Sequence, residues 1–224
     1  MKLYMHPAST TCRPIMLFAT EEGIALEQQV IDLFTGEHLK PAYLAINPNG
    51  LVPALEDGAF RLTESSAIMK YLADKSGSPA YPKDLQARAR VNEAMDWLNT
   101  NFYRAFGYGL CYAQLLDPYK LPDAAAQRLA IDAAKPRAEH YLQLLDKHWL
   151  GTGKNYLCGD RITLADYFAS GLLSLGEVTG CTFAAYPNVV KWYGRMKSLP
   201  HWQATNAGVY GWADFARGPS YVTV

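Results

Sequence analysis

The sequence has no excess of charge of either sign. Its 21 basic side chains balance 21 acidic ones, and no block of lysine and arginine is long enough to follow nucleic-acid phosphates. It also lacks a basic amphipathic stretch and any run of about 18 apolar residues that could span a bilayer. The first residues do not combine a charged lead with a long apolar core, as a signal peptide would. We therefore expect a cytoplasmic protein that binds neither nucleic acid nor membranes.

Cysteine is scarce and scattered. The four thiols, Cys12, Cys111, Cys158 and Cys181, show no metal-ligand spacing and no pattern of a disulfide framework. We therefore predict no metal site and mostly buried, free thiols. Only Cys12, near a predicted helix start, has a physical reason for a lowered pKa.

The chain changes from mixed strand and helix patterns to purely helical ones after about its first third. Half of the 224 residues are hydrophobic, which is enough for one large domain or two modest ones. Strand-like patterns end before the Gly/Ser/Pro-rich passage 76–82, and helical periodicity follows it. We predict an α/β domain over 1–77, a linker over 78–83 and an all-helical domain over 84–224.

Periodicity and turn residues place the individual elements. We predict strands at 2–6 and 27–32 and a hairpin of strands 51–55 and 59–62; helices are expected at 12–22, weakly at 36–46, at 67–73, 84–116, 122–150, 187–198 and 201–207. Thr163 and Asp166 have the spacing of a capping box, so we interpret this aspartate as structural and not catalytic.

The first strand, loop and helix carry the clearest chemical signal. Ser9 lies three residues before Cys12, the spacing of a Cys-x-x-Cys redox loop in which the first sulfur is replaced by oxygen. A hydroxyl at the first turn of a helix, where backbone N–H groups are unpaired, can act on an anion. The alternative is that Ser9, Thr10 and Thr11 only cap the helix.

Two further segments have the chemistry of a binding site. A cis bond before Pro53 would present the backbone of Val52 to a ligand, although an ordinary trans edge proline is the alternative. Ser65 could cap the helix that follows it, or its N–H and hydroxyl could receive a ligand carboxylate while Glu64 takes an ammonium group. The zwitterion of an amino acid would satisfy both residues.

Several separated motifs together resemble the cytosolic glutathione S-transferases. They are Ser9-x-x-Cys12-Arg13, Asn47-Pro48 through Val52-Pro53, Glu64-Ser65-x-Ala67-Ile68 and Gly159-Asp160-x-Ile162-Thr163-x-Ala165-Asp166. The serine form is most similar to the theta class and related bacterial enzymes, including dichloromethane dehalogenase. The resemblance implies a thioredoxin-like βαβαββα domain, an all-helical domain that completes an electrophile pocket, glutathione as co-substrate, and a homodimer.

The resemblance also implies roles for individual residues. Ser9 would stabilise the glutathione thiolate, and Glu64 and Ser65 would bind the γ-glutamyl end. Val52, with a cis Pro53, would bind the cysteinyl backbone.

At the glycine end, the resemblance implies that His38 approaches the carboxylate. Two positions depart from the pattern. Leu51 stands where theta enzymes often have a lysine, and Thr10 falls where the beta class has its cysteine, which makes Thr10 a competing hydroxyl.

Aromatic residues of the helical domain are candidates for the electrophile pocket. We name Tyr103, Phe106, Tyr108 and Trp212, although core packing is the alternative for each. Three functions follow from the sequence: a glutathione transferase or dehalogenase that uses Ser9, a glutathione-dependent disulfide reductase or peroxidase that uses Cys12, and a non-enzymatic ligand-binding module.

Overall fold

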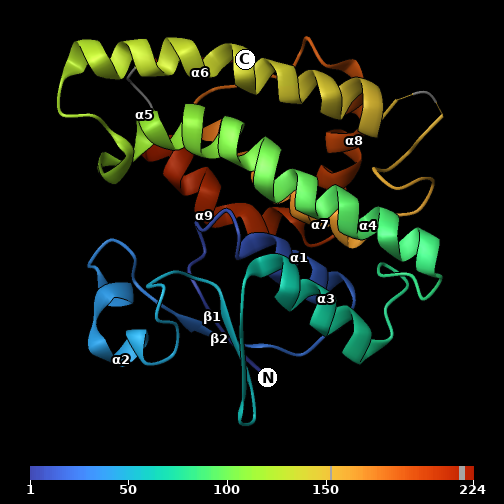
Figure 1. Cartoon of the computed structure of the whole chain (residues 1–224). Coiled ribbons are helices and arrows are strands. Elements are labelled where there is room, and N and C mark those ends of the chain that lie inside the picture. Colours follow the sequence, from blue (N-terminus) through green and yellow to red (C-terminus); the bar gives the residue numbers. More distant parts are fainter. Residues whose placement is uncertain (152, 217–219) are drawn as a thin grey trace.

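A four-stranded sheet forms the base of the first domain (Figure 1). The structure, a computed structural model, describes residues 1–151, 153–216 and 220–224. The strands are β1 (Lys2–Met5), β2 (Glu27–Val30), β3 (Ala54–Asp57) and β4 (Phe60–Thr63), in the order β2-β1-β3-β4. β1 pairs in parallel with β2 and antiparallel with β3, which forms the predicted hairpin with β4.

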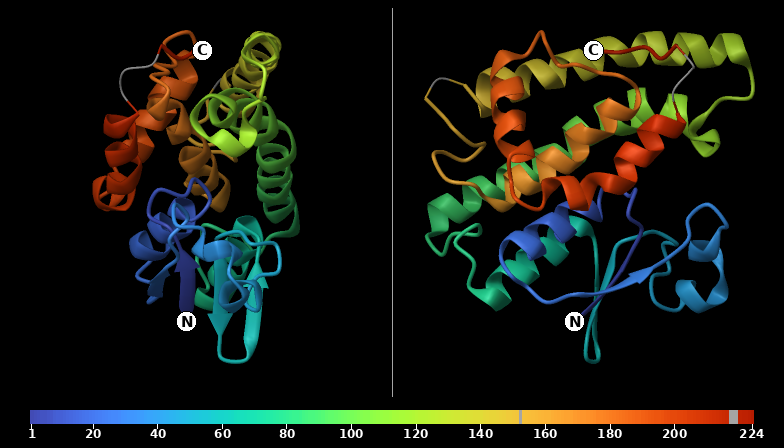
Figure 2. Two further views of the ribbon diagram at one scale, coloured as in Figure 1. Left: turned by 90° about the vertical axis from the view of Figure 1, so that its left-hand side faces the viewer. Right: turned by 180° about the vertical axis from the view of Figure 1, so that it is seen from behind.

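Helices cover one face of this sheet. The helical elements of the first domain are α1 (Arg13–Glu21), η1 (Glu37–Leu39), α2 (Pro41–Leu44) and α3 (Ser65–Ser76). α1 and α3 lie between the sheet and the helical half of the molecule, whereas α2 lies at the side (Figures 1 and 2). Inward residues of β1 and β3 join those of α1 and α3 in the buried core. The predicted thioredoxin-like domain is confirmed.

The rest of the chain is helical, as predicted. Its elements are α4 (Leu85–Trp97), η2 (Leu98–Tyr112), α5 (Ala113–Leu115), η3 (Asp117–Tyr119), α6 (Ala124–Leu144), η4 (Leu145–Trp149), α7 (Leu164–Val178), α8 (Pro187–Lys197) and α9 (Trp202–Phe215). α7 is buried along almost its whole length and packs on α1, α4 and α9.

Two predictions about these helices are wrong in part. The predicted helix 201–207 is too short, because α9 continues through Gly208 and Gly211 to Phe215. The long helix predicted over 84–116 is continuous, but its second part, η2, is π-helical and not α-helical. Both differences depend on tertiary contacts described below.

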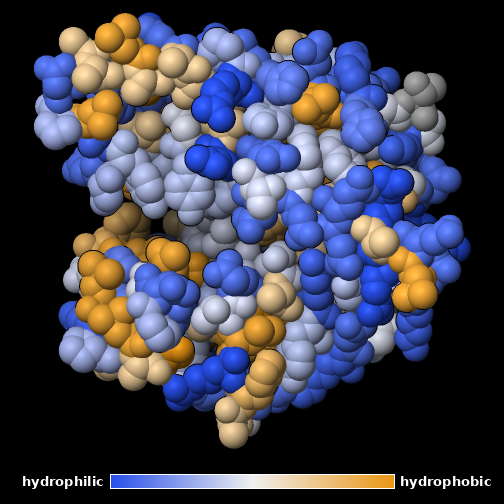
Figure 3. Space-filling view, viewed as in Figure 1, coloured by the Kyte–Doolittle hydropathy of each residue, from blue (hydrophilic) through white to orange (hydrophobic). Residues whose placement is uncertain are grey.

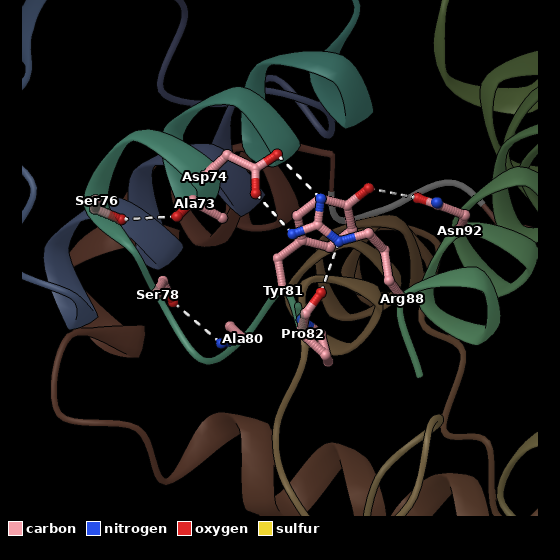
Figure 4. Close-up of polar contacts among 9 residues, drawn as sticks. All are labelled: Ala73, Asp74, Ser76, Ser78, Ala80, Tyr81, Pro82, Arg88 and Asn92. Atoms are coloured by element: carbon pink, nitrogen blue, oxygen red, sulfur yellow. Dashed lines mark hydrogen bonds and ion pairs between the residues drawn. The ribbon is translucent and has the colours of Figure 1, made fainter. Parts of the chain in front are cut away.

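The predicted linker between α3 and α4 is held by side chains from both (Figure 4). Arg88 of α4 donates to Asp74 of α3 at 2.8 Å and to the carbonyl of Pro82 at 2.6 Å. Its guanidinium also lies 4.2 Å from the ring centre of Tyr81, whose hydroxyl donates to Asn92. These contacts fix the direction in which the chain leaves the first domain.

Asp166 has the structural role that its spacing predicts. Its buried carboxylate accepts hydrogen bonds from the backbone N–H of Thr163 at 2.8 Å and of Leu157 at 2.9 Å, and from the indole N–H of Trp192 at 2.9 Å. Thr163 completes the capping box at the start of α7. One carboxylate therefore joins the loop before α7, the start of α7 and α8.

We expect Asp166→Ala to lower the free energy of unfolding by about 3 to 5 kcal/mol, because several buried donors lose their charged acceptor. Chemical denaturation measures this change. Asp160→Ala, at an exposed position of the same loop, is the matched control and should stay within about 0.5 kcal/mol of the parent. Equal effects of the two substitutions would contradict the structural role of Asp166.

Neither a membrane span nor a metal cluster is found in the described part of the chain. Over these residues, no helix combines the length and the apolar character needed to cross a bilayer. Nor do three or more His, Cys, Asp or Glu side chains gather there as metal ligands.

Candidate active site

The strand register brings the predicted site segments to one edge of the sheet. Tyr4, at the end of β1, is paired with Ala54, at the start of β3, and Ala54 with Thr63, at the end of β4. Because β2 runs parallel to β1, its end lies at the same edge. The loops that carry Ser9, His38, Val52 and Glu64 all leave or enter the sheet there.

Ser9 lies in the loop immediately before α1. Its Oγ accepts a hydrogen bond at 3.3 Å from the backbone N–H of Cys12, the residue before α1, although no side-chain cap bond is found at the helix start itself over the described residues. It also forms a long hydrogen bond, 3.3 Å, with the Thr11 hydroxyl, which itself donates to the carbonyl of Val52. Since an anionic acceptor binds a proton more strongly than a neutral one does, the Ser9 proton is available to a thiolate.

Thr10 and Cys12 are in different surroundings from Ser9. Thr10 is only 2% exposed and its hydroxyl accepts a bond from Tyr112 at 2.7 Å, facing the helical domain. Cys12 is fully buried, and burial raises the pKa of its thiol to about 11 despite its proximity to Ser9. At neutral pH this thiol is protonated and inaccessible.

The segment before β3 is held from two sides. The Leu51 carbonyl accepts bonds from the Tyr43 hydroxyl at 2.7 Å and from the Asn47 side chain at 2.6 Å. The Val52–Pro53 peptide bond is cis, as the resemblance implied. The side chain of Leu51 is exposed.

Glu64 and Ser65 stand at the start of α3. Glu64 has φ of 67°, a backbone conformation that residues other than glycine rarely adopt, and its side chain does not cap the helix. Ser65 is 8% exposed and begins the helix. An exposed carboxylate thus lies beside the unpaired N–H groups of a helix N-terminus.

His38 lies in η1, on the segment that follows β2. Its Nδ1 is buried and has no hydrogen-bond partner in the part of the chain that the structure describes. A buried ring nitrogen without a partner is uncommon, and a bound polar group would supply one.

Across from these loops, three tyrosines of η2 share one side of the helix. A π-helix has about 4.4 residues per turn, so Tyr103, Tyr108 and Tyr112, spaced by five and four residues, fall on the same face. In an α-helix of about 3.6 residues per turn, Tyr112 would lie opposite Tyr103. The ring of Tyr103 packs directly on the Cα of Gly107, because a Cβ at that position would lie 2.3 Å from the ring.

Tyr119 of η3 completes this group, with its ring centre 5.5 Å from that of Tyr108 and 5.6 Å from that of Tyr112. We call Tyr103, Tyr108, Tyr112 and Tyr119 the tyrosine cluster. The pKa of Tyr108 is raised, mainly by burial and in smaller part by the charge of Glu64. The cluster therefore faces the start of α3. On the left of Figure 3, the surface is hollowed between the α2 region below and the α5 region above.

Sequence reasoning missed Tyr112 and Tyr119, since the α-helical period does not place the former beside Tyr103. The prediction for Phe106 is wrong: it is fully buried and stacks on Phe102, so it does not line an accessible pocket. Trp212 is partly buried on α9, one turn beyond Gly208.

Two helices of the second domain touch the backbone of the Ser9 loop directly. A Cβ on Gly208 of α9 would lie 2.8 Å from the backbone of Pro7, and a Cβ on Gly171 of α7 would lie 2.3 Å from Pro14 and 3.2 Å from the Thr10 carbonyl. Glycine is therefore required at both positions for the helices to approach this closely. The position of the Ser9 loop depends on the helical domain.

We expect Gly208→Ala to lower both the free energy of unfolding, by about 1 to 3 kcal/mol, and the catalytic efficiency, because the added methyl group displaces the loop. Gly211→Ala is the control on the same helix, where a Cβ meets nothing within 4 Å. This control should be neutral or stabilising by up to about 1 kcal/mol with unchanged activity. Thermal unfolding and steady-state kinetics measure both effects, and full activity in Gly208→Ala would contradict the contact.

Comparison with known proteins agrees with this geometry. Residues 8–75 match the glutathione S-transferase N-terminal domain and residues 111–200 match the glutathione S-transferase C-terminal domain. Human glutathione S-transferase theta-1 is 36% identical over 201 residues, which cover 88% of this chain and 82% of that protein. The chain therefore belongs to the glutathione S-transferase family.

Within that family it is theta-like. Human glutathione S-transferase theta-2 is 35% identical over 202 residues, covering 89% of this chain and 81% of that protein. The crystal structure of human theta-2 with glutathione superposes with a TM-score of 0.84 at 31% identity, over 100% of this chain and 93% of that one. A delta-class enzyme of Nilaparvata lugens gives 0.80 at 30% identity, over 96% of this chain and 98% of that one.

Proposed function

We propose that the protein is a glutathione transferase in which the Ser9 hydroxyl donates a hydrogen bond to the glutathione thiolate. The observation that carries this proposal is the difference among the three candidates in the loop. Ser9 alone combines partial exposure with an available proton, whereas Thr10 is bonded into the domain interface and Cys12 is buried.

The free energy of one hydrogen bond from Ser9 is large enough to ionise the glutathione thiol at neutral pH. A thiol with a pKa of about 8.5 becomes mainly thiolate at neutral pH if its pKa falls by roughly two units, near 2.7 kcal/mol. One hydrogen bond to a charged group contributes about 1.5 to 3 kcal/mol. The Cys12 N–H bond to Ser9 Oγ polarises the hydroxyl further, and the N-terminus of α1 adds positive potential.

The remaining contacts of glutathione follow from the same sheet edge. Glu64 and the N–H groups at Ser65 would take the ammonium and carboxylate of the γ-glutamyl end, and Val52 would pair with the cysteinyl backbone. His38, whose Nδ1 lacks a partner, would meet the glycine carboxylate. Leu51 adds no charge there.

The thiolate would then attack an electrophilic carbon in the hollow beneath the tyrosine cluster. A carbon–sulfur bond forms, and where the acceptor carries a leaving group, that group departs with its bonding electron pair. One human theta-class structure contains the glutathione conjugate of 1-menaphthyl sulfate. A hydrophobic, aromatic electrophile of this kind would match the rings of Tyr108 and Trp212, which are at least partly exposed, whereas Tyr103 of the tyrosine cluster is buried. The family resemblance also supports a homodimer, which sedimentation would test.

We expect Ser9→Ala to raise the pKa of the bound glutathione thiol by about one to two units. The pH dependence of thiolate absorbance in the complex measures this shift, and kcat/KM at neutral pH should fall roughly 10- to 100-fold with it. Thr10→Val removes the other candidate hydroxyl and should change the thiol pKa less. A larger shift in Thr10→Val than in Ser9→Ala would overturn the assignment.

The disulfide reductase or peroxidase alternative depends on Cys12. We expect Cys12→Ala to retain turnover, with a loss of about 1 kcal/mol in the free energy of unfolding from the small cavity, because the thiol is buried and protonated. Assays with an electrophile and with a disulfide substrate test this. Loss of activity in a variant that remains folded would favour the thiol mechanism instead.

A further inference from the structure

The first residue of α1 carries a buried positive charge. Arg13 is 1% exposed, and its Nη1 donates to the Ser174 hydroxyl of α7 at 2.8 Å and to the Asn206 side-chain carbonyl of α9. Both acceptors are neutral. Its Nε and Nη2 are buried, and no described residue is a hydrogen-bond partner for either.

An unpaired guanidinium in the interior is costly. A buried cation is normally paired with a carboxylate or saturated with hydrogen bonds, because desolvation penalises the charge. Arginine keeps its proton even so, since its pKa, although lowered by burial, starts far above neutrality. Over the described residues, no carboxylate forms an ion pair with Arg13.

The titratable groups that face Arg13 are all neutral at neutral pH. They are Tyr193 of α8, Tyr112 and Tyr103 of η2, and Cys12. Burial raises the pKa of Cys12 to about 11 and that of Tyr112 to about 12, and it raises the pKa values of Tyr103 and Tyr193 strongly.

Carboxylates on the helices packed around α1 are otherwise engaged. Glu177 of α7 pairs with Lys197, Asp74 of α3 pairs with Arg88, and Asp166 is enclosed in the capping box. Glu177 also acts on Tyr193, which faces Arg13, but among the described residues none of these carboxylates forms an ion pair with the guanidinium.

Arg13 and its neighbour Cys12 are both hydrogen-bonded to Ser9. The backbone N–H of Arg13 donates to the Ser9 carbonyl at 3.2 Å, and that of Cys12 donates to Ser9 Oγ. The charge of Arg13 favours the ionised forms of both Cys12 and Tyr112, the latter bonded to Thr10. Its electrostatic potential therefore extends to the loop that holds the reacting sulfur.

We propose that Arg13 is a positioning residue that acts through its charge, an uncompensated cation that favours the anionic form of the sulfur held by Ser9. This inference rests on the proposed function, because it presumes a thiolate at Ser9. On this inference, the acceptors of Arg13 must be neutral, because an acidic residue in place of Ser174 or Asn206 would cancel the positive charge.

The most direct test introduces that cancelling charge. Asn206→Asp keeps the size of the side chain and places a carboxylate on Arg13 Nη1. We expect the pKa of the bound glutathione thiol to rise by about one unit, with kcat/KM roughly tenfold lower at neutral pH. Asn206→Ala removes the same hydrogen bond, and the Asn206 bond to the Trp202 carbonyl, without adding charge, so it should not raise the thiol pKa.

A second pair of variants decides the matter if Asn206→Asp does not fold. Arg13→Met removes the charge and should raise the pKa of the bound glutathione thiol. Arg13→Lys retains a positive charge, so its thiol pKa should stay close to that of the parent protein. Thiolate absorbance against pH is the readout, with thermal unfolding to verify the fold. An unchanged thiol pKa in folded Asn206→Asp, or equal shifts in Asn206→Asp and Asn206→Ala, would overturn the proposal.

Ser9→Ala, measured in parallel, separates this inference from the proposed function. If Ser9→Ala shifts the thiol pKa and the Asn206 and Arg13 variants do not, only the role of Arg13 fails. If Ser9→Ala leaves the thiol pKa unchanged, the assignment of Ser9 fails first.

Discussion

The contact between the backbone of residues 7–10 and the helical domain governs the geometry of the site. Gly208 and Gly171 let α9 and α7 approach this loop without a Cβ between them, and Tyr112 bonds to Thr10 from a third helix. A loop held on several sides keeps the Ser9 hydroxyl in one place at the start of α1. Such fixed placement is what a hydrogen-bond donor needs in order to stabilise a charge without reorganising.

The same contact joins the two domains at the Ser9 loop. The polar groups at the sheet edge come from the first domain, whereas the tyrosine cluster that faces them comes from the second. The linker around Tyr81, fixed by Arg88 and Asp74, sets the direction of the second domain. The buried Arg13 adds a charge at the junction, where the tyrosines and the Cys12 thiol around it stay neutral because burial raises their pKa values.

Much of this architecture could be predicted from the sequence. Local patterns located the strands, the hairpin around Gly58 and the capping box of Thr163 and Asp166, because each depends on residues close in the chain. The strand predicted at 51–55 was misplaced, since β3 begins at Ala54, after the cis bond to Pro53, and continues to Asp57. The motif around Ser9 predicted a site at the end of the sheet where β1 ends. Our proposal of Ser9 over Thr10 rests on tertiary contacts, since only these turn the Thr10 hydroxyl towards Tyr112.

What the sequence could not supply depends on contacts between distant segments. The predicted helix 201–207 stopped short of Gly208, a residue whose missing side chain lets α9 approach the backbone of Pro7. The π-helical turns that gather Tyr103, Tyr108 and Tyr112 have no periodic signal in an α-helical pattern. Arg13 belongs to a motif that the sequence shows, but only the packing of α7 and α9 reveals that its buried guanidinium has no ion-pair partner among the described residues.

The position of the glutathione sulfur relative to Ser9 tests the central claim most directly. A crystal structure of the protein with glutathione bound should place the sulfur within hydrogen-bond reach of Ser9 Oγ, with the γ-glutamyl end at Glu64 and Ser65. A sulfur that instead faces Thr10 or Cys12, with the Ser9 hydroxyl directed away from it, would contradict the account.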